Sequence, residues 1–367
     1  MRLVPVKNLE FGDVLGKPIL GEDGRVLLRA GVALSSGYIL KLQQKHYTYV
    51  YIQDSQTEDI EMDDIMSLSV QQEILVKIKS IYEKMQDPRV SEKLVKSGGL
   101  GKDFGRLFQI MFDALMADHT FVVNVLALFS SDAYLYTHSM NVGVIASILG
   151  VANGLNQDRL RTLGLGAMLH DIGKTKIDGR ILNKPGQLTA EEREAIQQHS
   201  RLGYEIIKHQ DMPLVAAHCA YQHHEKYDGT GYPRKLKGEQ IHDFGRLLAV
   251  ADVYDALTSN RSYRKAMLPN EAVEYLYAHC GKQFDPKMVS LFTQHVNIYP
   301  NGLPVRLSSG VEGVVACYNL GNLQRPVVRV LTENGHPVIP YEVDLSKQLN
   351  VTITSVDFED LKIERDA

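Results

Sequence analysis

The segment 133–157 contains no Asp, Glu, Lys or Arg, so it belongs either in a membrane or in a protein core. Its length is sufficient to span a bilayer. However, it also contains His138, Ser139, Asn141 and Asn153, and each of these polar side chains would be costly on a helix that faces lipid. We therefore expect a buried core helix and no membrane span.

The composition is that of an ordinary globular protein of two to three domains, with 44% hydrophobic and 23% charged residues in 367. A net charge of −4 gives no basic surface for nucleic acid, so neither DNA nor RNA is an expected partner. A small anionic ligand held by a few local cations is still compatible with this charge.

The cysteines and the N-terminus indicate a cytoplasmic protein. Cys219, Cys280 and Cys317 are odd in number and far apart, which argues against a disulfide framework and against a cysteine-based zinc site. The first residues lack the long apolar segment of a signal peptide.

Hydrophobic periodicity divides the chain into four segments. Residues 1–55 are predicted to form a small αβ module, with a hairpin at PILGEDGRVLL, a helix at SSGYILKLQQK and a strand at YTYVYI. Residues 56–119 form a helical linker region, in which 97–106 is expected to be a hinge or break. Residues 120–300 are all-helical, and 301–367 form a small β-domain with a turn at Asn334-Gly335.

Seven His and Asp residues of the helical segment are candidate metal ligands. Taken singly they are weak evidence, because a lone histidine is more often a satisfied core residue and an adjacent His pair arises by chance among thirteen histidines. An Asp in the apolar run RLLAVADVYDAL is stronger evidence, since a buried carboxylate needs a metal, an arginine or a helix end as its partner. Imidazole and carboxylate donors together favour Fe, Mn, Zn or Ni. The candidates are His138, His170, Asp171, His199, His223, His224 and Asp252. Of these, His199 is expected to follow a capped, charged helix that begins after Thr189.

The run HDIGK, 170–174, combines two of these candidates with a cation. An Asp beside a His can bridge two metals while the His binds one of them, and Lys174 would then point toward a bound anion. A second His-Asp pair, His242-Asp243, has no such lysine, and we expect it at the surface.

HDIGK, followed by HHEKYDGTGYP (223–233) and DVYDALTSNRSYRKA (252–266), closely resembles the HD-GYP domains of bacteria, a subgroup of the HD metal-dependent phosphohydrolases. The resemblance extends over roughly residues 130–290. It implies an all-helical HD-type domain, so the chain is expected to be mainly α, with small β-rich modules on either side. It also implies two or three metal ions and hydrolysis of cyclic di-GMP.

The resemblance assigns roles to individual residues. All seven candidates match metal ligands of the family, with Asp171 bridging, and Lys174 matches a residue that contacts the scissile phosphate. The catalytic residues are thus expected to be Asp171 and Lys174. Substrate contacts are expected from the Gly-rich loop and from two arginines, which could instead be surface charges. These residues are Asp228, Gly229, Gly231, Tyr232, Pro233, Arg261 and Arg264.

Two departures from the family pattern modify these expectations. Family members with three metals carry a Glu four residues before the first histidine, where this chain has Tyr134, so we expect two divalent ions. Fe or Mn are expected, with Ni or Zn as alternatives. The family sequence Asp-Arg-Pro-Tyr-Arg is NRSYR at 260–264, which loosens a turn but removes no cation.

The expected reaction is hydrolysis of cyclic di-GMP to pGpG, GMP or both, through a hydroxide that bridges the two metals. Two alternatives stay open: a phosphodiesterase for another cyclic dinucleotide such as cyclic GMP-AMP, and a non-catalytic receptor or scaffold for cyclic di-GMP. A protein partner at the N- or C-terminal module and a homodimer are also open.

Overall fold

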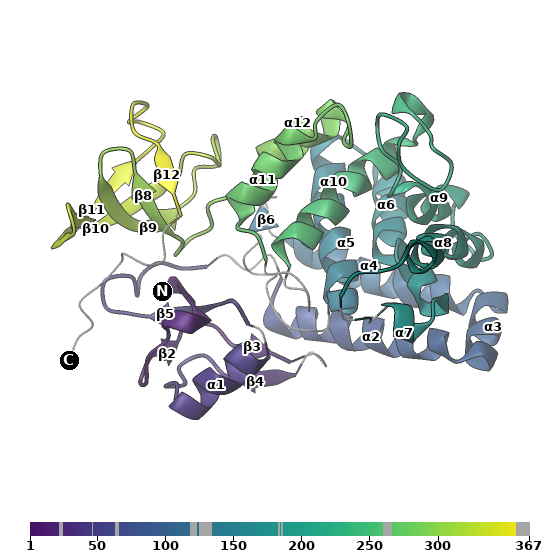
Figure 1. The fold of residues 1–367 in the computed structure, drawn as a ribbon, viewed down its shortest axis with the longest axis horizontal. Coiled ribbons are helices and arrows are strands. Elements are labelled where there is room, and N and C mark those ends of the chain that lie inside the picture. Colours follow the sequence, from purple (N-terminus) through teal and green to yellow (C-terminus); the bar gives the residue numbers. More distant parts are fainter. Residues whose placement is uncertain are drawn as a thin grey trace. The chain divides into compact units, whose positions relative to one another are not determined.

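The computed structural model describes residues 1–21, 25–45, 47–62, 66–117, 123–124, 134–182, 184, 186–259 and 266–356. The chain forms two compact units (Figure 1). One is helical and comprises 65–123 and 133–295. The other is built mainly of strands and comprises 1–64, 124–132 and 296–367.

The uncharged segment forms the central helix of the helical unit. This helix, α5 (Tyr134–Ala152), packs against α6 (Gln157–Leu169) and α10 (Asp243–Thr258). By length and composition 135–152 could cross a membrane, and it is the one such helix in the described part of the chain. However, 78% of this segment is buried inside the protein. The expected core helix is therefore present.

The predicted helical linker region packs onto the same core. In α2 (Leu68–Gln86), Ile74, Ile78 and Ile81 are buried, because their spacing places them on one face of the helix. The predicted break at 97–106 is much shorter than expected, because two residues, Ser97 and Gly98, separate α3 (Pro88–Lys96) from α4 (Gly99–Ala117). Gly98, at φ +65°, makes this turn, and the residues after it continue as helix.

The remaining helices complete the core around the predicted ligands. α9 packs between α6 and α8, and a short 3-10 helix, η3, lies against α8. These elements are η3 (Ile172–Lys176), α7 (Gly179–Leu182), α8 (Ala190–Ile207), α9 (Leu214–Gln222), η4 (Gly238–Gln240), α11 (Pro269–Ala278) and α12 (Pro286–His295).

The N-terminal part of the second unit contains the three elements expected from its sequence. The order of its three-stranded antiparallel sheet is β1-β5-β2, and β3 and β4 form the predicted hairpin. Ser35 caps α1 by accepting a hydrogen bond from the backbone of Tyr38. The elements are β1 (Arg2–Pro5), η1 (Val6–Asn8), β2 (Val14–Leu15), β3 (Ile19–Leu20), β4 (Val26–Leu28), α1 (Ser36–Gln44) and β5 (Tyr49–Gln53).

The C-terminal part is a five-stranded antiparallel sheet in the order β11-β10-β9-β8-β12. Asn334 and Gly335 both have positive φ, +49° and +76°, and form the predicted turn between β10 and β11. The strands are β8 (Pro304–Leu307), β9 (Val311–Cys317), β10 (Val327–Glu333), β11 (His336–Asp344) and β12 (Ile353–Ser355). β6 (Val123–Asn124) and β7 (Val296–Asn297) are short strands where the chain passes between the units.

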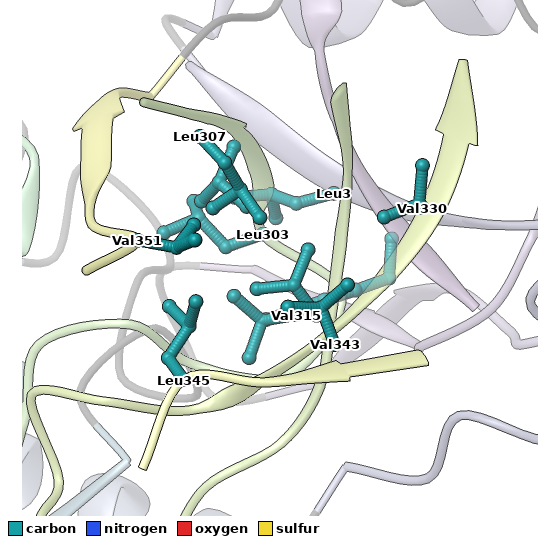
Figure 2. Close-up of a cluster of buried hydrophobic side chains, with 11 residues drawn as sticks. Leu3, Leu303, Leu307, Val315, Val330, Val343, Leu345 and Val351 are labelled. Carbon is teal, nitrogen blue, oxygen red and sulfur yellow. The ribbon is translucent and has the colours of Figure 1, made fainter. Parts of the chain in front are cut away.

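The two ends of the chain share one hydrophobic core (Figure 2). Leu3 and Tyr51 pack with the β8–β11 side chains, and the amide of Leu3 donates to the carbonyl of Gly302 at 2.8 Å. Arg329 of β10 binds the carboxylate of Asp59 at 2.7 Å. The predicted terminal modules thus form one folded unit, although more than 200 residues separate them in sequence. The core consists of Leu3, Tyr51, Leu303, Val305, Leu307, Val315, Val328, Val330, Val343, Leu345 and Val351.

Candidate metal centre

The helical unit brings all seven predicted ligands into two adjacent groups. In each group, one donor atom per residue lies within 4.8 Å of all the others, and every side chain is buried or half-buried. Such groups can hold a metal ion because their nitrogens and oxygens converge on one point. The first group is His138, His170 and Asp252; the second is Asp171, His199, His223 and His224.

The carboxylate of Asp171 lies between the two groups. Its Oδ2 is 3.6 Å from His138 Nε2 and 3.5 Å from His170 Nε2. Its Oδ1 is 3.3 Å from His199 Nε2 and 3.8 Å from His223 Nε2. One carboxylate therefore faces both groups, which is the arrangement required of a bridging ligand.

Backbone hydrogen bonds fix the orientation of three histidines. Nδ1 of His170, His199 and His223 lies 2.7, 2.6 and 3.1 Å from the carbonyl oxygens of Ala167, Ile196 and Cys219, respectively. A carbonyl oxygen only accepts, so each Nδ1 must carry the proton and each Nε2 must present its lone pair. This hydrogen-bond pattern is common for metal-binding histidines.

In the second group, the inward-facing atoms lack the protons that would allow them to bond to one another. His199 Nε2 and His223 Nε2 are 3.3 Å apart, and both are acceptors. Asp171 Oδ1 is buried and has no hydrogen-bond partner among the described residues. Buried acceptors that face one another are unfavourable unless a cation lies between them. The residues therefore fit divalent metal ions.

Asp255 and Asn141 support the first group, and sequence reasoning missed both. Nδ1 of His138 donates to Asp255 Oδ2 at 2.7 Å, and Asn141 donates to Asp255 Oδ1 at 2.7 Å. Asp255 is fully buried one turn after Asp252 in α10. A second carboxylate in the apolar run RLLAVADVYDAL was the available signal.

The charges of the ligands also suit metal binding. Burial lowers the pKa of His199 and of His223 to about 4, so both are neutral near pH 7. Burial alone would raise the pKa of Asp171, but Lys174 and the neighbouring histidines outweigh it and hold this pKa well below its usual range. Burial acts to lower the pKa of His138, yet hydrogen bonds to Asp252 and Asp255 outweigh it and raise the pKa to about 9. A metal at the first group would displace this proton.

The HDIGK run is positioned by close contact with α8. His170 caps the end of α6, and 172–176 turn back as η3. A Cβ on Gly173 would lie only 2.0 Å from the backbone oxygen of His199, so no larger residue fits. This contact sets Asp171 beside His199. The ammonium of Lys174 is paired with Asp171 Oδ2 at the edge of the centre.

His199 occupies a different place in its helix from the one expected. We predicted that it follows the helix that begins after Thr189, but α8 continues to Ile207 and His199 lies in its middle. The capping box of Thr189 and Glu192 fixes where α8 begins.

The Gly-rich loop lies directly against the ligand pair. The ring of Tyr232 packs on His224 with centroids 4.8 Å apart. A Cβ on Gly231 would come within 2.3 Å of the amide nitrogen of Lys226, so glycine is required there. The buried carboxylate of Glu225, also missed in the sequence, accepts hydrogen bonds from the amides of Arg234 at 2.7 Å and Leu236 at 2.9 Å.

Other residues predicted to contact substrate lie at varied positions. Asp228 is exposed and binds the backbone and hydroxyl of Thr230, which shapes the turn that continues through Gly229 at φ +87°. Pro233 is exposed and follows Tyr232. Arg261 and Arg264 lie outside the described residues, as does the side chain of Tyr134.

The His242-Asp243 pair is half-buried and separate from both ligand groups. His242 caps the start of α10, and Asp243 forms an ion pair with Arg159 at 2.5 Å. These local partners account for both residues.

Comparison with known proteins identifies the segment that contains this centre. Residues 123–288 match the HD domain family. This segment is an HD domain. All seven predicted ligands, Lys174 and the Gly-rich loop lie within it.

Relatives of the HD domain include named phosphodiesterases. A Pseudomonas aeruginosa protein named a cyclic di-GMP phosphodiesterase is 38% identical over 230 residues, which cover 62% of this chain and 55% of that protein. The cyclic di-GMP phosphodiesterase response regulator RpfG of Xanthomonas campestris is 42% identical over 161 residues, covering 43% of this chain and 42% of RpfG. A Vibrio cholerae protein named 3'3'-cGAMP-specific phosphodiesterase 2 is 39% identical over 160 residues, covering 43% of this chain and 31% of that protein. The chain thus spans about half the length of the first relative and less of the other two.

Proposed function

We propose that this protein is a metal-dependent phosphodiesterase that hydrolyses cyclic di-GMP to pGpG, GMP or both. The observation that carries the proposal is the position of Asp171 between two buried ligand groups, with the ammonium of Lys174 paired to the same carboxylate. This combination offers donor atoms for two cations and, at their edge, a partly exposed ammonium for one anion.

The two groups would each hold one divalent ion, Fe or Mn in the first instance and Ni or Zn as alternatives. Such ions would supply an activated water molecule and offset negative charge on the phosphoryl oxygens. Asp171 holds the two groups together through its separate oxygens. Asp255 holds His138 in the orientation that directs Nε2 inward.

Lys174 is the residue best placed to bind the scissile phosphate. Its side chain is about one-fifth exposed, whereas Asp171 beside it is buried. A substrate phosphate could therefore reach the ammonium and accept a hydrogen bond from it. That interaction would strengthen as charge develops on the phosphoryl oxygens, which is how an electrostatic contact accelerates a reaction.

A phosphodiesterase for cyclic GMP-AMP is a second candidate, because one relative is named as specific for 3'3'-cGAMP. A receptor that binds cyclic di-GMP without turnover is less well supported, since the full ligand set and Lys174 are present. A cytoplasmic location stays a prediction.

Product analysis tests the proposal. The protein would be purified without oxygen, loaded with Fe or Mn, and incubated with cyclic di-GMP and with cyclic GMP-AMP in parallel. We expect metal-dependent pGpG or GMP from cyclic di-GMP, and none from an Asp171→Asn variant treated in the same way. Faster turnover of cyclic GMP-AMP would favour the second candidate. Tight binding without product would favour the receptor.

A further inference from the structure

The Gly-rich loop, whose Tyr232 packs on the predicted ligand His224, is strongly basic at its far end. Residues 226–237 contain four cations, Lys226, Arg234, Lys235 and Lys237, and only one acid, Asp228. The chain as a whole has a net charge of −4, so positive charge is concentrated here. Arg234 and Lys235 are exposed, and no described carboxylate forms an ion pair with either of them.

Lys235 has a backbone conformation that lysine rarely adopts. Its φ is +55°, in the left-handed region that favours glycine. The other described non-glycine residue with positive φ is Asn334 in the C-terminal sheet, and asparagine tolerates this region well. Strained residues of this kind occur preferentially at ligand sites, because the surrounding structure must hold them in place.

Glu225 holds Lys235 in this conformation. Its buried carboxylate accepts hydrogen bonds from the amides on both sides of Lys235, those of Arg234 and Leu236. Successive amides around a left-handed residue form a concave anion site, which Glu225 fills here. Glu225 directly follows the ligand His224 in sequence. We call Arg234 and Lys235 the basic tip. Its position is therefore tied to the metal centre by one buried side chain, that of Glu225.

We propose that Arg234 and Lys235 bind the part of a dinucleotide substrate that lies away from the metals, at its second phosphate. This inference rests on the proposed function. A cyclic dinucleotide carries two phosphates, and the metal centre with Lys174 engages the one that is cleaved. The second phosphate keeps its negative charge, and exposed cations on a loop that is anchored by the neighbour of His224 complement it.

A substitution at Lys235 can separate this role from a purely structural one. Lys235→Gly removes the cation and relieves the backbone strain, so we expect the unfolding temperature to stay the same or to rise. We expect the KM for cyclic di-GMP to rise about three- to fivefold, with kcat nearly unchanged, as for loss of one solvent-exposed ion pair. Lys235→Arg should keep the wild-type KM. Adding salt should weaken substrate binding less in Lys235→Gly than in the wild-type protein.

Asn334→Gly in the C-terminal sheet is the matched control, since it relieves backbone strain at a residue with positive φ without removing a charge. It should change neither KM nor kcat. An unchanged KM in both Lys235→Gly and Arg234→Gln would overturn the inference.

The test also distinguishes failure of the inference from failure of the proposed function. Binding of cyclic di-GMP to the Asp171→Asn protein, with and without Lys235→Gly, would be measured by calorimetry in the same buffer. If the wild-type protein lacks hydrolysis, the proposed function fails, but a weaker affinity in the Lys235→Gly protein would still support the basic tip. Equal affinities would show that the basic tip does not bind the substrate, whether or not the wild-type protein is active.

Discussion

Nδ1 of His138 and Oδ2 of Asp255 lie 2.7 Å apart within the buried core of the HD domain. Asn141 binds the other oxygen of the same carboxylate, so both oxygens of Asp255 are engaged. The hydrogen bond fixes which nitrogen of His138 faces the metal centre. Three other histidines obtain the same orientation from backbone carbonyls, whereas His138 depends on a side chain.

Asp255→Asn should therefore weaken metal binding at the first group. The amide cannot provide the negative charge that supports His138, and losses of about 10- to 100-fold in metal affinity or activity are usual for such changes. Metal content per chain, measured after dialysis against a weak chelator, checks this directly. We expect the content to fall from about two ions toward one. Full retention of both ions would show that Asp255 only fills space.

Lys174→Gln should slow hydrolysis far more than it reduces metal content. The ammonium is the partly exposed partner of Asp171 and is not among the ligand atoms, so both ligand groups remain in this variant. Loss of a charge aimed at the reacting phosphoryl group typically costs about 100- to 1000-fold in kcat. Single-turnover kinetics on metal-loaded protein give the rate, and elemental analysis gives the content. Equal loss of metal and rate would make Lys174 a structural residue.

Gly173→Ala should destabilise the helical unit severely. The added Cβ would lie 2.0 Å from the backbone oxygen of His199, so η3 and α8 would have to separate. We expect a loss of at least about 1–3 kcal/mol in the free energy of unfolding, measured by urea denaturation. Gly105→Ala in α4 is the matched control, because the nearest atom to the added Cβ would be in the Arg161 side chain, at an ordinary 3.6 Å. The control should be neutral or gain about 0.5–1 kcal/mol. Equal stability of the two variants would contradict the close packing of η3 on α8.

The metal-free protein should lose stability as the pH falls from about 6.5 to about 4. Burial lowers the pKa of His199 and His223 to about 4 in the folded state, while the unfolded chain has the ordinary value near 6.5. In this range the unfolded chain binds protons that the folded chain does not, so protonation favours unfolding. His138 does not add to the pH dependence of the free energy of unfolding in this range, because its folded pKa is raised to about 9. Its stabilising contribution is fully present below about pH 6.5 and is lost only as the pH rises above that value.

Urea unfolding of chelator-treated protein between about pH 7 and about pH 4.5 measures this effect. We expect the free energy of unfolding to fall by about 5 kcal/mol, roughly half of it from each of His199 and His223. His199→Gln should make the free energy of unfolding depend less steeply on pH, because it removes one of the histidines whose folded pKa burial lowers. A flat profile across this range would contradict the buried, neutral state of these histidines.

Local signals in the sequence predicted much of the fold. The β3–β4 hairpin, the helix α1 and the Asn334-Gly335 turn each depend on a few neighbouring residues, and each is present. The length of α8 was predicted wrongly, because its charged first half has no stop signal and the helix continues past His199. The shared core of Leu3 with the C-terminal sheet depends on contacts between distant segments, which periodicity does not report.

The residues of the metal centre divide in the same way, into those that the sequence predicts and those that depend on contacts between distant segments. The seven predicted ligands could be named from their residue types and from the resemblance to the HD-GYP family, and the structure brings them together. Asp255 and Glu225 could not, because their importance comes from what they bind in three dimensions: His138 for the first, and the two amides around Lys235 for the second. Both are carboxylates in buried positions, where only such partners make them stable.

The bridging position of Asp171 is the central claim, and the metal content of Asp171→Ala tests it most directly. The variant would be stripped, reloaded with Mn or Fe, and analysed for ions per chain together with hydrolysis of cyclic di-GMP. The account predicts fewer ions than in the wild-type protein and no detectable hydrolysis, since both groups lose the ligand they share. A variant that retains two ions and wild-type turnover would contradict it.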